Sequence, residues 1–279
     1  MWIKVKGLNN PIAFDGVPNL VKILDKVLRG WTFQDIKKGK GTPLIRLKAG
    51  ARGYERRSPW IKGGDAIVFP DPVDAVCDLL LDLEHAYIKD SHNLLALHAA
   101  GAKIGSNLVV FPSTHGAGKS LLTAALAQSG HRVFADDQLP ILPGSPTIAV
   151  APGFLPRLRN PLPDDLDQNI LDFIESHSGP QSAQFRYVDL PEEVLAPLGE
   201  QAPIQGIVLL NRVFGASPKM EPVSEAEVLK TCVLQSFGRS LNAIELIDHL
   251  HNMVKDAVCV KLTYSTVKQA QALLQEKFA

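Results

Sequence analysis

The first eighty residues are a succession of short apolar runs broken by turn-forming residues, such as LIRLKAG and DAIVFPDP. One segment departs from this pattern. Residues 19–30 (NLVKILDKVLRG) repeat apolar positions at helical spacing and end at Gly30, the residue type favoured just after a helix. The pattern predicts a small α+β unit over residues 1–83 with one helix.

From residue 84 onward, strand-like and helix-like segments alternate. The predicted strands are LLALHAAG, LVVF, HRVFADD, QLPILPG, TIAVAPG, IQGIVLLNR and AVCVKLTYS. The predicted helices are GKSLLTAALAQSG, LDQNILDFIES, SEAEVLKTCVLQSF, AIELIDHLHNMVKD and TVKQAQALLQEKF. This alternation is typical of an α/β domain, which we place at residues 84–279.

Composition and charge narrow the class of protein. The 279 residues carry 29 basic and 29 acidic side chains, so there is no basic excess of the kind that nucleic acid recruits. The N-terminus lacks a signal-peptide core, and no run approaches about 18 apolar residues. Cys77, Cys232 and Cys259 are scattered singly, which favours buried thiols over disulfides or a zinc site. We expect a cytoplasmic protein that binds neither nucleic acid nor a membrane.

Residues 52–64 (RGYERRSPWIKGG) combine four cations with Tyr54 and Trp60. Such a segment is either a site for an anion or a partner, or a solvated loop. The sequence favours the solvated loop.

Residues 109–130 (VVFPSTHGAGKSLLTAALAQSG) have the form of a phosphate-binding loop between a strand and a helix. The pattern Gly-x-x-x-x-Gly-Lys-Ser/Thr lets backbone N–H groups surround phosphate oxygens at a helix N-terminus, with Lys as counter-charge and Ser/Thr on Mg²⁺. The corresponding residues are Ser113, Thr114, His115, Gly116, Ala117, Gly118, Lys119 and Ser120. Only Ser113 departs from the pattern, which is acceptable if its backbone needs no conformation reserved for glycine. The alternative is a tight turn without a ligand.

Two adjacent carboxylates, Asp136 and Asp137, close the apolar strand that follows the loop helix. In phosphoryl transfer one carboxylate commonly supports the metal shell and another takes the proton of the acceptor hydroxyl. The alternative is a solvated strand end. Two histidines are also candidates: His98, in the strand before the loop, is either structural or functional, and His115 is either a phosphate donor or simply exposed.

Together the motifs LHAAG, STHGAGKS and ADD resemble the catalytic domain of the bacterial HPr serine kinase/phosphorylase and the broader HPr-kinase-like group. In that family a histidine precedes the loop as His98 precedes Ser113, and paired aspartates follow the loop lysine as Asp136 and Asp137 follow Lys119. The resemblance covers about residues 84–215 and extends weakly to the C-terminus. It implies a fold related to phosphoenolpyruvate carboxykinase, with a mixed sheet and a Walker A loop.

The resemblance also implies an ATP- and Mg²⁺-dependent transfer of the γ-phosphoryl group to a hydroxyl. Lys119 and the loop amides would hold the phosphates, Ser120 would bind Mg²⁺, and Asp137 would support the metal shell. Asp136 would be the general base, with His98 positioning phosphate or the carboxylates. The implied nucleotide-binding set is Ser113, Thr114, His115, Gly116, Ala117, Gly118, Lys119, Ser120, Leu121, Arg157 and Arg159.

Several positions depart from the family. Ser113, His115 and Leu121 stand where the family has glycine, serine and an acidic residue, and the glutamate-bearing signature is replaced by GFLPRLRNPLP. Arg157 and Arg159 in that segment resemble a basic element of divergent members. As alternate residues of a strand they face one side, where they either hold phosphate or an acidic acceptor or form a solvated edge. HPr as substrate and phosphorylase activity are therefore not expected.

Two functions follow. The first is a kinase acting on a Ser/Thr hydroxyl of a peptide or small protein, or on a small-molecule hydroxyl, with the N-terminal unit presenting the acceptor. The second is a nucleotide-binding or ATPase-only module that regulates a partner. The sequence does not identify the acceptor. A homo-oligomer is implied only by the resemblance to the family.

Overall fold

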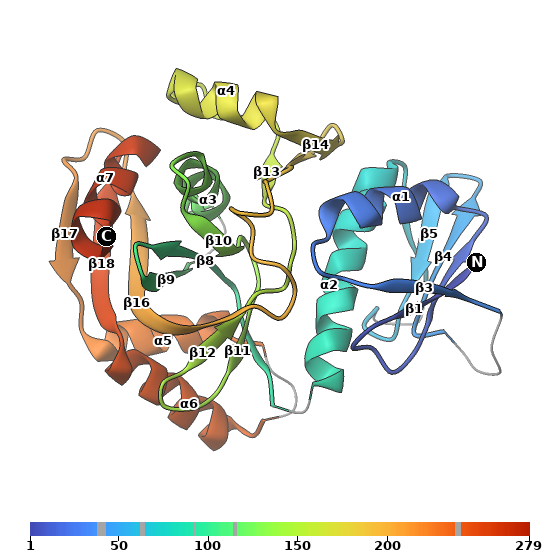
Figure 1. Ribbon diagram of the computed structural model, residues 1–279, viewed down its shortest axis with the longest axis horizontal. Coiled ribbons are helices and arrows are strands. Elements are labelled where there is room, and N and C mark those ends of the chain that lie inside the picture. Colours follow the sequence, from blue (N-terminus) through green and yellow to red (C-terminus); the bar gives the residue numbers. More distant parts are fainter. Residues whose placement is uncertain (38–42, 62–64, 92, 114–115, 238–240) are drawn as a thin grey trace.

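The computed structural model describes residues 1–37, 43–61, 65–91, 93–113, 116–237 and 241–279. Over these residues the strands form three sheets, of six, nine and three strands (Figure 1). Parallel and antiparallel pairings occur together in both larger sheets: β2 is parallel to β4 in the first, and β16 is parallel to β9 and β18 in the second. The chain is therefore a mixed α/β protein with mixed sheets, as the sequence predicts.

The six-stranded sheet belongs to the N-terminal part of the chain and has the order β3-β1-β2-β4-β5-β6. Its strands are β1 (Trp2–Val5), β2 (Ile12–Asp15), β3 (Phe33–Ile36), β4 (Ile45–Gly50), β5 (Gly53–Arg57) and β6 (Ile67–Phe69). Two helices pack against each other and against this sheet, α1 (Pro18–Val27) and α2 (Pro72–Asp90). The sequence analysis expected one helix here, so α2 corrects that prediction.

Helix α2 was not predicted from the spacing of apolar residues because it is buried on several sides. Its N-terminus carries a clear signal, since the Asp71 carboxylate accepts hydrogen bonds from the amides of Val73 and Asp74 and Pro72 follows directly. Figure 1 shows α2 standing between the N-terminal sheet and the rest of the molecule. A helix packed on both sides lacks the single apolar stripe of a surface helix. The predicted boundary between residues 83 and 84 falls inside α2.

The nine-stranded sheet places the ends of its parallel strands at one edge. The 12-residue strand β16 runs parallel to β9 and to β18, so the carboxyl ends of all three strands meet there. In sheets of this kind ligands bind outside the carboxyl ends of the strands. The strands are β7 (Leu95–Leu97), β8 (Ala99–Ile104), β9 (Asn107–Pro112), β10 (Arg132–Ala135), β11 (Leu139–Leu142), β12 (Ile148–Val150), β16 (Gln201–Arg212), β17 (Lys219–Pro222) and β18 (Val258–Tyr264).

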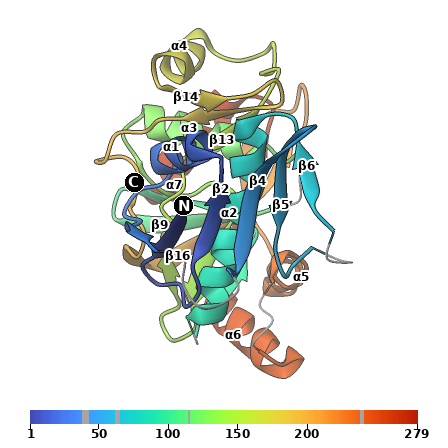
Figure 2. The ribbon, with the colours of Figure 1, turned by 90° about the vertical axis from the view of Figure 1, so that its right-hand side faces the viewer.

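Helices cover both faces of this sheet. α3 (Lys119–Gln128) and α7 (Val267–Phe278) pack together on one face, and α5 (Glu225–Gln235) and α6 (Ala243–Asp256) lie on the other. The third sheet and its helix lie beside α3 (Figure 2). They comprise β13 (Arg157–Arg159), β14 (Ser178–Gln181), β15 (Phe185–Val188) and α4 (Gln168–Ser176). Within the described ranges, no helix has the length and apolar character needed to cross a bilayer.

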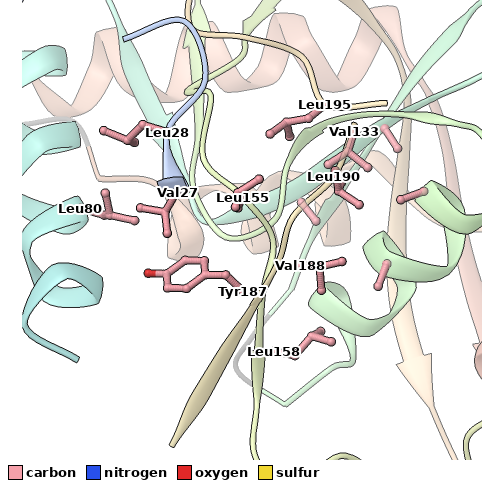
Figure 3. Packing of buried hydrophobic residues seen from close by; sticks show 14 of the residues in the cluster. Val27, Leu28, Leu80, Val133, Leu155, Leu158, Tyr187, Val188, Leu190 and Leu195 are labelled. Carbon is pink, nitrogen blue, oxygen red and sulfur yellow. The ribbon is translucent and has the colours of Figure 1, made fainter. Parts of the chain in front are cut away.

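One apolar cluster joins the N-terminal unit to the rest of the chain. It runs from Val27 at the end of α1 through Leu80 of α2 to Leu155 and Tyr187 (Figure 3). Backbone hydrogen bonds reinforce it: the Arg29 amide donates to the Gly153 carbonyl at 2.7 Å, and the Leu155 amide donates to the Val27 carbonyl at 3.0 Å. The two parts of the chain are thus packed as one body around this cluster.

The cationic segment 52–64 is not a solvated loop over its described part. Residues 53–57 form β5, and the Arg56 side chain is only 4% exposed because its guanidinium is paired with Asp78 and Asp82 of α2. The expectation fails because the partners of Arg56 lie on a helix that is distant in sequence. All three cysteines are free thiols, and the expected burial is confirmed for Cys77 and Cys232, whereas Cys259 is only partly buried.

Replacing Arg56 by Met leaves the nearly buried Asp82 carboxylate without its counter-charge. We expect this change to lower the free energy of unfolding by about 3–5 kcal/mol, measured by urea denaturation. The neighbouring exposed Arg57 is the matched control, and Arg57→Met is expected to change it by less than about 0.5 kcal/mol. Equal effects of the two substitutions would contradict a structural role for the buried pair.

Candidate functional site

The phosphate-loop segment connects β9 to α3 at the sheet edge where the parallel strands end. Gly116 and Gly118 both have positive φ, +83° and +86°, a conformation that other residues rarely adopt. A Cβ on Gly118 would lie 3.1 Å from the Tyr264 hydroxyl, which itself donates to the Ala117 carbonyl at 2.9 Å. The end of β18 therefore shapes the loop, and Gly118 is required both by conformation and by space.

Ser113 does not need to be a glycine. Positive φ occurs only at glycines among the described residues, so Ser113 adopts an ordinary backbone conformation. It is 6% exposed, and its carbonyl accepts a hydrogen bond of 2.7 Å from Lys119 Nζ. The departure at Ser113 is therefore compatible with the loop geometry, as the sequence analysis required. Thr114 and His115 lie outside the described residues.

Lys119, His98 and Asp137 form a chain of polar contacts. Lys119 Nζ lies 3.0 Å from His98 Nε2, and His98 Nδ1 lies 3.3 Å from Asp137 Oδ1. With the proton on Nδ1, the ring accepts from the ammonium group and donates to the carboxylate. Burial lowers the pKa of Lys119, and the charges of Asp137 and Asp136 oppose this shift. His98 was expected within a strand but lies at the bend between β7 and β8, which turns its ring toward Lys119.

Asp136 is the more buried of the two adjacent carboxylates. It follows β10 directly and is 8% exposed. Its Oδ2 accepts a hydrogen bond of 2.9 Å from the Arg157 amide, whereas its buried Oδ1 has no hydrogen-bond partner within the part of the chain that the structure describes. Burial raises the pKa of Asp136 to about 6, opposed by the hydrogen bond from the Arg157 amide. A carboxyl group with one oxygen anchored by a backbone amide and a raised pKa can accept a proton as a general base.

Three arginines surround the pocket. Arg157 is held near Asp137, with 3.7 Å between its Nη2 and Asp137 Oδ2, and also contacts the Cys77 thiol. Arg159, two residues along β13, is exposed and lines the same pocket, which matches the expected common side of the strand. Arg212, at the end of β16, was not predicted; it is paired with Asp165 at 2.8 Å. No motif marks Arg212, since only the parallel pairing of β16 and β9 brings it to the loop.

One open pocket brings together most of the predicted site. His98 and Ser113 are not among its lining residues, but both contact Lys119, which is. The predicted residues that line it are Gly116, Ala117, Gly118, Lys119, Ser120, Leu121, Asp136, Asp137, Arg157 and Arg159.

The oxygen donors of the pocket fit Mg²⁺ that is bound together with substrate phosphates. Over the described residues, no three His, Cys, Asp or Glu side chains form a ligand cluster of their own. Mg²⁺ commonly keeps several waters and is bound through one or two carboxylates together with substrate phosphates. Ser120 and Asp137 line the pocket beside the phosphate loop, so they supply protein ligands of the required kind.

A further acidic residue, Glu84 of α2, was missed by the sequence analysis. It is 1% exposed, and over the described residues neither carboxylate oxygen has a hydrogen-bond partner. Burial and, secondarily, the charge of Asp137 raise its pKa well above the ordinary value. The available signal was a charged residue inside the apolar run LLLDLEHAYI, which is costly in a buried helix without a purpose.

Because the folded-state pKa of Glu84 is raised, folding is penalised once the pH exceeds the unfolded value of 4.5. Glu84→Gln removes this penalty. We expect the variant to be more stable than the natural protein by roughly 1 kcal/mol or more at about pH 8, and the gain to shrink toward about pH 4. Denaturant unfolding at both pH values measures the difference. A gain that is equal at both values would contradict the assigned cause.

Comparisons with known proteins find similarity among solved structures. No protein-family model matches the sequence, and no curated protein matches it. The structure of the HPr(Ser) kinase/phosphatase from Coxiella burnetii is similar at a TM-score of 0.33 and 12% sequence identity, over 65% of this chain and 95% of that chain. The residues of the site, rather than this likeness, carry the functional proposal.

Proposed function

We propose that this protein is an ATP- and Mg²⁺-dependent phosphotransferase that transfers the γ-phosphoryl group to a hydroxyl. One observation carries the proposal: Asp136, a buried carboxyl group with a raised pKa, lines the same pocket as Lys119 and the loop glycines. A site for phosphate alone has no need of such a base. The resemblance of the three motifs to HPr-kinase-like proteins, with a core related to phosphoenolpyruvate carboxykinase, supports the same assignment.

The loop and the surrounding cations provide for the nucleotide phosphates. The amides at the start of α3 and the Lys119 ammonium group hold the phosphates, aided by the positive end of the helix. Arg157, Arg159 and Arg212 line the opposite part of the pocket and neutralise the charge of the transferring group. Positioning and charge stabilisation of this kind supply most of the catalysis in phosphoryl transfer.

Ser120 and Asp137 would hold Mg²⁺, which would supply neutralisation of the negative charge of the nucleotide phosphates. His98 keeps Lys119 and Asp137 in fixed positions, because its two ring nitrogens contact one each. His98 is thus a positioning residue in this proposal.

The acceptor hydroxyl gives its proton to Asp136 Oδ1 as its oxygen bonds to the γ-phosphorus. The bond from that phosphorus to the bridging oxygen breaks, and its electron pair leaves with ADP. The Arg157 amide holds the other oxygen of Asp136 and so fixes the orientation of the base. The raised pKa of about 6 makes Asp136 a better proton acceptor than an ordinary aspartate while leaving it ionised at neutral pH.

A second candidate function is a nucleotide-binding or ATPase-only module that regulates a partner. The buried Ser113 hydroxyl favours it, because this group replaces the usual loop glycine and has no hydrogen-bond partner among the described residues. The proposed acceptor class remains a Ser/Thr hydroxyl of a peptide or small protein, or a small-molecule hydroxyl. A cytoplasmic bacterial homo-oligomer is part of the same proposal.

Asp136→Asn removes the base while keeping the size of the side chain. We expect phosphoryl transfer to hydroxyl compounds or peptides of a cell extract to fall by about 10²–10⁴-fold, whereas Mg-ATP still binds. Transfer is followed with γ-labelled ATP, and binding by calorimetry. Asp172→Asn on the exposed side of α4 is the matched control and should leave both quantities unchanged.

The outcomes separate the two functions. Tight Mg-ATP binding by the natural protein without transfer to any hydroxyl would contradict the kinase and favour the module. Absence of nucleotide binding would contradict both.

A further inference from the structure

A second cavity adjoins the phosphate pocket. Asp136, Asp137 and Arg157 line both, whereas none of the other residues of the second cavity belongs to the phosphate loop. About 430 Å³ of space free of protein atoms lies in the cavity and in front of it, and part of that space is open solvent. A molecule bound there would reach the candidate base without displacing the nucleotide phosphates, which is the position that an acceptor must occupy.

The walls of this cavity are mostly apolar and come from both parts of the chain. Leu80 and Leu81 of α2 form one wall, and Phe154, Leu155 and Tyr187 form the other. Figure 3 shows Leu80 and Leu155 on either side of Tyr187, whose hydroxyl points toward α2. Such walls favour the burial of a compact apolar group.

The cavity is held in shape by contacts between the N-terminal unit and the segment that forms its far wall. The Trp31 indole donates to the Pro152 carbonyl at 2.8 Å, and its ring stacks on Phe154 with centroids 5.8 Å apart. A Cβ on Gly153 would lie 2.2 Å from the Arg29 carbonyl, so the two backbones are in close approach. A preformed cavity lowers the cost of ordering a bound molecule.

Glu84 gives the cavity its specific polar feature. Its carboxyl group is buried in the α2 wall, and neither oxygen has a partner among the residues that the structure describes, a costly arrangement unless a ligand supplies one. Asp136 and Asp137 add acidic character, and the one cation in the lining, Arg157, already contacts Asp137 and Cys77. The excess of carboxyl groups favours a ligand that carries hydrogen-bond donors and positive charge.

We propose that this cavity is the acceptor subsite and that it takes a compact alcohol bearing an ammonium group. The apolar body lies against Leu81 and Phe154, the partly exposed apolar residues of the lining, the ammonium group pairs with Glu84, and the hydroxyl meets Asp136. The inference rests on the proposed phosphotransferase function, and it names the acceptor class. The hydroxyl proton passes to Asp136 Oδ1 as the new oxygen–phosphorus bond forms and ADP departs.

Two probes that differ only by the amine test the subsite: leucinol and 4-methyl-1-pentanol. Their affinities are measured by calorimetry on the full chain saturated with Mg-ADP, so that no turnover occurs. We expect leucinol to bind at least about tenfold more tightly, because only leucinol carries a charged donor for Glu84. Equal affinities for the two probes would overturn the proposal.

Two variants address the two parts of the cavity. Glu84→Gln should abolish the preference for leucinol, and Leu81→Trp, at a partly exposed position on α2, should weaken both probes by at least about tenfold by filling the cavity. The matched controls are Glu175→Gln and Leu234→Trp, both at exposed positions outside the cavity, and they should change neither affinity. An unchanged leucinol affinity in both cavity variants would overturn the proposal.

Mg-ADP affinity, measured first on the natural protein, distinguishes a failure of the proposed phosphotransferase function from a failure of the acceptor subsite. Failure to bind Mg-ADP would overturn the proposed function together with the subsite. Normal Mg-ADP binding without a preference for leucinol would overturn the subsite alone.

Discussion

The Lys119 ammonium group is a nearly buried charge that needs partners, and its partners connect the whole site. A buried charge is tolerated only when it is paired and hydrogen-bonded. Here the Ser113 carbonyl and the His98 ring meet that requirement. His98 in turn contacts Asp137, and Asp137 lies beside Arg157 of the small third sheet. One cation thus fixes the loop, both sides of the pocket and the carboxylates relative to one another.

The arrangement of the site also depends on the packing of the N-terminal unit against the rest of the chain. Helix α2 lies between the N-terminal sheet and the core, and its inner face supplies Cys77 to Arg157 and Glu84 to the cavity beside Asp136. A separate domain on a flexible linker would place such groups imprecisely. The shared apolar cluster and the backbone hydrogen bonds at Arg29 and Leu155 make the unit a structural part of the site.

Much of the site could be predicted from the sequence because its parts are local motifs in a fixed order. The strand–loop–helix around Lys119 and the carboxylates after β10 are each set by a few consecutive residues. The C-terminal helices followed from periodicity for the same reason, whereas the mixed sheet was implied by the resemblance to the HPr-kinase-like group. The domain division and the individual roles of the site residues stay predictions.

The missed features depend on contacts between segments that are distant in sequence. Arg212 reaches the pocket only through the parallel pairing of β16 with β9. Helix α2 lacks a single apolar face because elements pack on several sides of it, and the partners of Arg56 lie on that helix. The sequence does not show that Glu84 lines the cavity, because this depends on the packing of α2 beside Asp136 and Asp137. Residue spacing does not encode such contacts.

The central claim is that the loop, the carboxylates and the arginines form one site for Mg-ATP with its γ-phosphate beside Asp136. A crystal structure with Mg²⁺ and a non-hydrolysable ATP analogue tests this most directly. The account predicts that the β- and γ-phosphates lie on the amides at the start of α3 and on Lys119, with the γ-phosphate between Asp136 and Arg157. A nucleotide bound elsewhere, or bound here with its γ-phosphate turned away from Asp136, would contradict it.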